Sequence, residues 1–251
     1  MNYNYKVVSR PVYGQGGNRI KGYQGNFRED TGECLAITSD KYKIVHHQEV
    51  LETIESNLDF GSFNRKVYSI KDGKRIYAVY DFTEQRRSIK EGDDVGFRLL
   101  AKNSYDGSSG VTLAAGLLRI ICSNGMVVMS NETHVTRHHS PNFDIGFLEQ
   151  TIAQSKQDWV ASVEFFKNMS NKLITPAEGT RFLDSLVSDE VVAKKHIEEI
   201  KKIWLQPTYE QDRTRSTYNL YNAVTQYLTP LSEDKFELAQ RTSKQILAKL
   251  A

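Results

Sequence analysis

Asp72-Gly73 lies between two runs of β-branched and aromatic residues within the segment Val67–Tyr80. A two-residue turn between antiparallel strands needs positive φ at both of its residues, and Asp followed by Gly meets this need at little cost. The segment therefore predicts a β-hairpin with a type I′ turn. Because so short a turn sets the register, Tyr68 is expected to face Tyr77.

This register divides the hairpin into two faces, because directly opposed residues of paired strands share a face. One face carries Val67, Ser69 and Ile76 and is expected to contact the core. The other face carries Lys66, Tyr68, Arg75 and Tyr77. Paired tyrosines beside cations form a surface on which bases can stack. Tyrosines are also ordinary cross-strand partners on a solvated sheet, so both interpretations stay open.

The hydrophobic pattern changes near residue 140. Before it, the sequence predicts a short helix over residues 48–58 and further strands over 97–103 and 111–122. After it, apolar residues recur every three or four positions, and Thr175-Pro-Ala-Glu178 has the pattern of a capping box. The predicted fold class is α+β, with an antiparallel β-sheet with hairpins in the N-terminal half and a helical C-terminal half.

Three regions are expected along the chain. Residues 1–28 carry five cations and no acid, and they alternate tyrosines with glycines, which predicts a flexible basic arm. Residues 29–140 form a β-rich core with one short helix, and residues 141–251 form a helical region packed on that core as one domain. A flexible arm with rings and cations suits single-stranded nucleic acid, although a loosely ordered terminus is the plain alternative.

Composition limits the general class of the protein. The 251 residues include 33 basic and 31 acidic side chains, a net charge of +2, so no overall field draws the chain to DNA or membranes. No apolar run approaches the roughly 18–20 residues that a membrane span needs. The first residues lack the apolar segment of a signal peptide, and two cysteines form no disulfide framework. A cytoplasmic location is therefore expected.

Catalytic patterns are weak throughout. His134, His138 and His139 are close in sequence, and on a helix the first two could share a metal, but no third and fourth ligand stands at a recognised spacing. Cys122 ends an apolar strand, where a cysteine is more often a small core residue than a nucleophile. We expect no catalytic residue, cofactor or bound metal, and an enzyme is the less favoured class.

Two stretches carry a family resemblance: Asn103-Ser-Tyr-Asp-Gly-Ser108 and Leu118-Arg-Ile-Ile-Cys-Ser-Asn124. They resemble the signature stretches of the phage/plasmid-like family catalogued as the domain of unknown function number 932, and similar features extend over residues 40–230. Tyr105 stands where the family usually has His. The matching motif residues are Asn103, Asp106, Gly107, Ser108, Arg119, Cys122 and Asn124. The resemblance implies a mobile element in a bacterial host cytoplasm and no established activity.

The favoured function is a phage- or plasmid-encoded protein that binds and anneals single-stranded DNA in recombination or replication. The order of a helix, hairpins and then helices also resembles annealing proteins of the RecT and Erf sort, in topology only. Annealing needs cations for the backbone and rings that leave base edges free. The expected contacts are Arg19, Lys21, Lys66, Tyr68, Arg75, Tyr77, Arg86 and Arg87. A homo-oligomeric ring or filament is expected, without a membrane partner.

Two alternatives remain at this point. The first is a non-enzymatic protein–protein interaction factor that acts on a host enzyme or defence system, which the near-neutral charge favours. The second is a metal-dependent hydrolase that uses the three histidines. Salt separates DNA binding from protein interaction, because only the former loses affinity steeply as salt rises.

Overall fold

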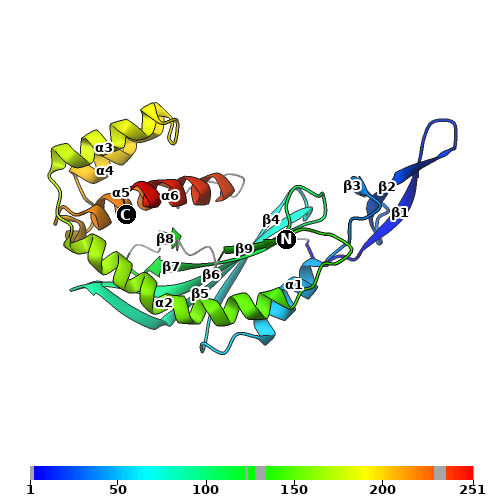
Figure 1. The fold of residues 1–251 in the computed structure, drawn as a ribbon, viewed down its shortest axis with the longest axis horizontal. Helices are drawn as coiled ribbons and strands as arrows, with labels where there is room; N and C mark the ends of the chain where they lie inside the picture. Colours follow the sequence, from blue (N-terminus) through cyan, green and yellow to red (C-terminus); the bar gives the residue numbers. More distant parts are fainter. Residues whose placement is uncertain (1–2, 122–123, 128–133, 229–235, 251) are drawn as a thin grey trace. The chain divides into compact units, whose positions relative to one another are not determined.

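The computed structural model describes residues 3–121, 124–127, 134–228 and 236–250 of the chain (Figure 1). It confirms the α+β class: strands dominate the N-terminal half and helices the C-terminal half. The helical elements are α1 (His47–Ser56), α2 (Phe147–Asn171), α3 (Pro176–Ser188), α4 (Lys194–Leu205), the 3-10 helix η1 (Glu210–Asp212), α5 (Thr217–Leu228) and α6 (Phe236–Leu250).

The strands form two antiparallel sheets. A three-stranded sheet has the order β1 (Val7–Tyr13), β2 (Arg19–Arg28) and β3 (Cys34–Ser39). A six-stranded sheet has the order β4 (Asn64–Ile70), β5 (Arg75–Lys90), β6 (Asp93–Ser104), β7 (Val111–Arg119) and β8 (Asn124–Val127), and β9 (His134–Arg137) also pairs with β7. The residues expected to form a flexible arm are therefore mostly strand.

The chain divides into two compact units, each built from three segments. The first unit comprises Met1–Tyr80, Leu99–Ala114 and Asn131–Ser155, and the second comprises Asp81–Arg98, Ala115–Ser130 and Lys156–Ala251. Neither unit ends at the expected boundaries after residues 28 and 140. Strands β5, β6 and β7 and helix α2 each contribute residues to both units, so a division by sequence segments cannot describe this fold.

The predicted hairpin turn is confirmed. Asp72 and Gly73 have φ values of 56° and 82°, and the amide of Lys74 donates to the carbonyl of Lys71 at 3.2 Å. Lys71 also has a positive φ of 51°. The sequence pattern does not call for this third left-handed residue.

Contacts from distant residues hold this turn inside the first unit. The hydroxyl of Tyr5 donates to Asp72 O at 3.1 Å, and Nε2 of His47 donates to Gly73 O at 2.9 Å. The amide of Tyr105 donates to Lys74 O at 2.8 Å. The turn is thus an anchored part of the unit, because three of its carbonyls have partners far away in the sequence.

The helix starts and ends follow local rules. The predicted capping box at α3 is confirmed: the Thr175 side chain accepts from the Glu178 amide, and the Glu178 carboxylate accepts from the Thr175 amide. Helix α1 lies where residues 48–58 predicted it and buries Val50, Leu51 and Ile54. Helix α4 ends before Pro207, as expected because proline has no backbone N–H to donate to a helical hydrogen bond.

In the second unit, α3 packs closely on α4 at a glycine. A Cβ built on Gly179 would lie 2.5 Å from the indole of Trp204, whose Nε1 donates to Pro176 O at 3.2 Å. Trp204 is almost fully buried. The two helices therefore approach at a distance that only glycine permits. Among the described residues, no helix has the length and apolar character that a membrane span requires.

Candidate nucleic-acid interface

The three-stranded sheet of the first unit has one buried and one open face. Paired residues share a face, and the register pairs Arg10 with Gly25 and Gly25 with Ile37. Tyr23 and Phe27 are on the same face, because side chains along a strand alternate. Tyr23 is 52% exposed and Ile37 is 63% exposed. We call this surface, Arg10, Tyr23, Phe27 and Ile37, the open sheet face.

Glycine at position 25 shapes the open sheet face. A Cβ at Gly25 would lie 2.3 Å from the Phe27 ring, so the ring occupies the space that any other side chain would take. The guanidinium of Arg10 lies 5.6 Å from the centroid of this ring, within the range of a cation–π contact. Among the described strands, no acidic residue shares this face. The result is a ring and a cation side by side on an exposed sheet.

The buried face attaches the sheet to the rest of the first unit. Asn26 is fully buried, and its Nδ2 donates to Tyr105 O at 2.8 Å. Arg28 lies 4.1 Å from the centroid of the Tyr5 ring and donates through Nε and Nη2 to both carboxylate oxygens of Asp30. Burial raises the pKa of Tyr5 to about 12. Residues of this face contact other residues of the first unit, so the opposite face is the one available to a ligand.

Arg19 and Lys21, two of the expected contacts, lie at the start of β2 and are exposed. They stand next to the open sheet face along the same strand. Lys66 and Tyr68 form a second pair on β4, with the ammonium 4.4 Å from the ring centroid. Lys66 is exposed and Tyr68 is half-buried, so the three cations are accessible to a nucleic acid and the Tyr68 ring is only partly so.

Arg75 and Tyr77 do not form the expected stacking surface. Tyr77 is only 6% exposed, because β5 is covered on both faces from Ile76 to Tyr80. Arg75 donates through Nε to the Asp106 carboxylate at 2.8 Å. The expectation that these two side chains face solvent was wrong, since a local hairpin pattern does not show what covers its second face.

Arg86 and Arg87 belong to the second unit. Both are exposed, within an exposed run from Glu84 to Ser88 of β5. Nε of Arg86 donates to Thr83 O at 2.7 Å. The open sheet face is part of the first unit, so it does not include these arginines.

The first family motif is a buried hydrogen-bonded turn. Asn103 donates through Nδ2 to Val45 O at 2.9 Å and to Nδ1 of His47 at 3.0 Å, and its Oδ1 accepts from the next amide. Burial lowers the pKa of His47 to about 3. The ring of Tyr105, which replaces the family's histidine, stacks on His47 with centroids 3.8 Å apart. These groups are satisfied by one another and hold the turn in place.

The exposed end of this motif is also engaged within the chain. Gly107 has φ of 71°, which glycine adopts without strain, and a Cβ there would contact Thr38. Burial alone would raise the pKa of Asp106, but hydrogen bonds from Ser108 and Arg75 outweigh it, so the pKa lies below its ordinary range. Within the first unit, the motif therefore contacts both Arg75 of β5 and Thr38 of β3.

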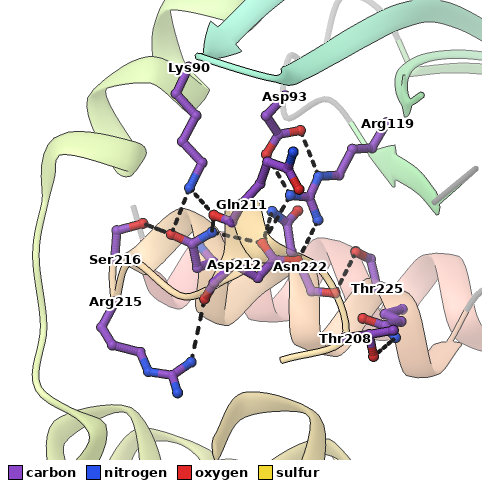
Figure 2. A network of polar contacts seen from close by, with 12 residues as sticks. Lys90, Asp93, Arg119, Thr208, Gln211, Asp212, Arg215, Ser216, Asn222 and Thr225 are labelled. Atoms are coloured by element: carbon purple, nitrogen blue, oxygen red, sulfur yellow. Dashed lines mark hydrogen bonds and ion pairs between the residues drawn. The ribbon is translucent and has the colours of Figure 1, made fainter. Parts of the chain in front are cut away.

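The second family motif centres on Arg119, in the second unit (Figure 2). Arg119 is fully buried and donates to both carboxylate oxygens of Asp93 and of Asp212. Burial alone would lower the pKa of Arg119, but the hydrogen bonds to the two carboxylates outweigh it and raise the pKa above its ordinary value. Lys90 donates to Gln211 O beside this group. The network links η1 to strands β6 and β7.

The described histidines do not have the spacing expected of a shared metal site. Residues His134–Arg137 form strand β9, so the helical spacing that would bring His134 and His138 together is absent. His139 is buried and donates through Nδ1 to Lys43 O at 3.1 Å, and burial lowers its pKa to about 4. No group of three His, Cys, Asp or Glu that could hold a metal occurs in the part of the chain the structure describes. Cys122 lies outside that part, and the backbone of Asn124 pairs with Arg119.

Sequence reasoning missed Arg10, Tyr23, Phe27 and Ile37 as members of one surface. The alternation of Tyr23, Gly25 and Phe27 is the period-two pattern of a strand. The many glycines nearby favoured flexibility instead. The signal was present, but the prediction took Gly25 as one of the glycines of a flexible arm.

Fold and surface together define an α+β protein with two buried polar motifs and one exposed surface of rings and cations. The chain matches the family model described as Domain of unknown function (DUF932) over residues 34–246, and it belongs to that family. No curated protein and no solved structure matches the chain. Strands β1 and β2, which carry most of the open sheet face, precede the matched region.

Proposed function

We propose that the chain binds single-stranded DNA on the open sheet face. The observation that carries this proposal is the Phe27 ring resting on Gly25, with Arg10 beside it and the exposed Tyr23 two residues before Gly25 in the strand. Aromatic side chains stack on any base, and cations hold the phosphate backbone. A duplex keeps its base faces stacked, so these rings select the unpaired strand.

This binding suits annealing. Rings that stack on base faces leave the base edges free to pair, and no reacting group is required. Following the family resemblance, we place this activity in the cytoplasm of a bacterial host, in recombination or replication of a phage or plasmid. A homo-oligomeric ring or filament, which lines up many open sheet faces along one strand, is part of the same proposal.

A binding assay tests the proposal. We expect the full-length chain to bind fluorescein-labelled oligo-dT in anisotropy titrations, with affinity that falls steeply as salt rises. Tyr23→Ala should weaken binding by about 1–3 kcal/mol, the usual contribution of a base–ring contact. Arg10→Ala should weaken binding and flatten the salt dependence. Arg213→Ala removes an arginine whose side chain is 75% exposed in the second unit and serves as the matched control.

Cys34 gives a second readout that does not depend on altering the face. This cysteine is exposed and pairs with Phe27 across the strands. In a Cys122→Ser background, oligo-dT should slow the reaction of Cys34 with a thiol reagent, and blunt duplex should not. Equal reaction rates with and without oligo-dT, together with normal binding of Tyr23→Ala, would refute the assignment of this face.

A protein partner is the second candidate, and exposed apolar side chains favour it. Ile37 and Tyr13 are 63% and 61% exposed on the same small sheet. If the open sheet face contacts a protein, Ile37→Ser should abolish that contact with little response to salt, and oligo-dT should not bind at any salt concentration.

A further inference from the structure

The hairpin of β1 and β2 extends past the third strand of its sheet. Strand β3 pairs with residues 23–27 of β2, so no described strand pairs with the part from Tyr13 to Lys21 on that side. Every residue in this part is exposed. Backbone contacts close its end: Tyr13 pairs with Arg19, and the amide of Gly14 donates to Asn18 O at 2.9 Å. We call residues 13–21 the ribbon tip (Figure 1).

The ribbon tip combines cations with large apolar side chains. Arg19 and Lys21 are exposed, and no described residue provides a carboxylate partner for them. Tyr13 is 61% exposed and Ile20 is 43% exposed. The strand pairing shifts opposite this segment, and Gly22 has φ of 82°, so β2 bulges here. Bulges commonly re-aim side chains at functional positions.

We propose that the ribbon tip binds duplex DNA next to the strand held on the open sheet face, so that the chain recognises the junction between single-stranded and duplex DNA. This inference rests on the proposed function. A two-stranded ribbon has the width that the major groove admits, about 12 Å. Exposed cations contact the phosphates on both sides of such a groove.

The apolar side chains of the tip fit the end of a duplex. Apolar side chains inserted at a base step unstack it, and the cost is smallest where pairing already ends. Tyr13 and Ile20 provide such side chains, and Lys21 lies between Ile20 and Tyr23 of the open sheet face along β2. Single-stranded DNA alone would contact only the open sheet face, which already supplies rings and cations for it. The ribbon tip would then have no DNA to contact. The junction uses both surfaces.

Three fluorescein-labelled probes test the inference: oligo-dT, a blunt DNA hairpin, and the same hairpin with an oligo-dT tail. We expect the tailed hairpin to bind about tenfold tighter or more than oligo-dT, because a second linked contact raises the effective concentration. Tyr13→Ser with Ile20→Ser keeps the charge and should remove this preference while leaving oligo-dT binding within about twofold. Arg19→Ala with Lys21→Ala should reduce binding of the tailed hairpin more than binding of oligo-dT.

The outcomes separate this inference from the proposed function. If the tailed hairpin binds no tighter than oligo-dT, or if the tip variants weaken both probes by the same factor, junction recognition is overturned while DNA binding stands. If Tyr23→Ala leaves oligo-dT binding unchanged, the open sheet face is overturned. Because all four altered tip residues are exposed, circular dichroism should show unchanged folding of these variants.

Discussion

Arg10 and Arg119 have nearly the same ring contact and opposite surroundings. The guanidinium of Arg10 lies 5.6 Å from the Phe27 centroid, and that of Arg119 lies 5.7 Å from the Tyr218 centroid. Arg119 is fully buried and bonded to two carboxylates, whereas Arg10 is exposed on a face without acidic residues. A cation–π contact therefore does not by itself show whether an arginine can bind a ligand. The carboxylates decide whether an arginine is available to a ligand.

The comparison extends to the regions around these residues. Each family motif has a described residue that is buried and bonded within the chain: Asn103 with His47 in the first unit, and Arg119 with its carboxylates in the second. The open sheet face and the ribbon tip expose rings and cations. Motif residues that identify the family thus stabilise the fold, and the surface proposed to bind DNA lies elsewhere on the chain.

The largest effect is expected from removing the buried arginine. Arg119→Met leaves Asp93 and Asp212 buried without their cation, which should lower the free energy of unfolding by about 3–5 kcal/mol. Urea denaturation followed by circular dichroism measures this loss. Arg10→Met, a matched change on the open sheet face, should alter stability by under about 0.5 kcal/mol. Equal stability of the two variants would contradict the distinction drawn between the arginines.

Acid should destabilise the first unit through its buried histidines. His47 and His139 have pKa values of about 3 and about 4 because of burial, against 6.5 in the unfolded chain. Above pH 6.5 both states are neutral, so these groups do not affect stability. As the pH falls below 6.5, only the unfolded chain takes up the protons, so stability falls. At pH 5 each histidine should cost roughly 2 kcal/mol.

Urea midpoints measured from pH 7 to pH 5 check this expectation. His139→Phe keeps an aromatic ring beside Tyr42, whose centroid lies 4.6 Å from that of His139, and should remove about half of the acid sensitivity. His138→Phe, at the exposed neighbouring position, is the control and should change the pH dependence much less, because burial and not the neighbouring His138 is the main cause of the low pKa of His139. A pH-independent midpoint in the parent chain would show that these histidines are not buried in the neutral form.

Features set by neighbouring residues could be predicted from the sequence. The Asp72-Gly73 turn depends on φ preferences, and the capping box at Thr175 and Glu178 depends on residues three apart. Both predictions are confirmed. They were possible because all the groups involved lie within one short segment. The family resemblance is confirmed for the same reason, since each motif is a contiguous stretch.

Features that depend on distant residues could not be predicted. Arg75 meets Asp106 across 31 positions, and Arg119 meets Asp212 across 93 positions. Residues His134–Arg137 become a strand because β7 is beside them to pair with. The open sheet face required knowing that β3 completes the sheet, which places Ile37 next to Gly25. No spacing within one segment shows these partners.

A smaller stability effect is expected at the buried glycine of the second unit. In Gly179→Ala the new Cβ meets the Trp204 indole at 2.5 Å. Trp204 is 1% exposed, so the ring has no space into which it can move. Overpacking of this kind costs about 1–3 kcal/mol. Thermal denaturation measures the loss, and Gly146→Ala, at a position where the nearest atoms are 3.3 Å or more away, should cost less.

A still smaller stability effect is expected at the corresponding glycine of the open sheet face, where the same change is also expected to weaken binding. In Gly25→Ala the new Cβ meets the Phe27 ring at 2.3 Å, a closer approach than at Gly179. The Phe27 ring lies on an exposed face and can rotate towards solvent, so stability should fall by under about 1 kcal/mol. The displaced ring no longer lies on the sheet beside Arg10, so oligo-dT binding should weaken by about 1–3 kcal/mol. Urea denaturation and anisotropy on the same preparation measure both quantities. A variant that loses stability but keeps its affinity for oligo-dT would show that the Phe27 ring is part of the core and not of the binding surface.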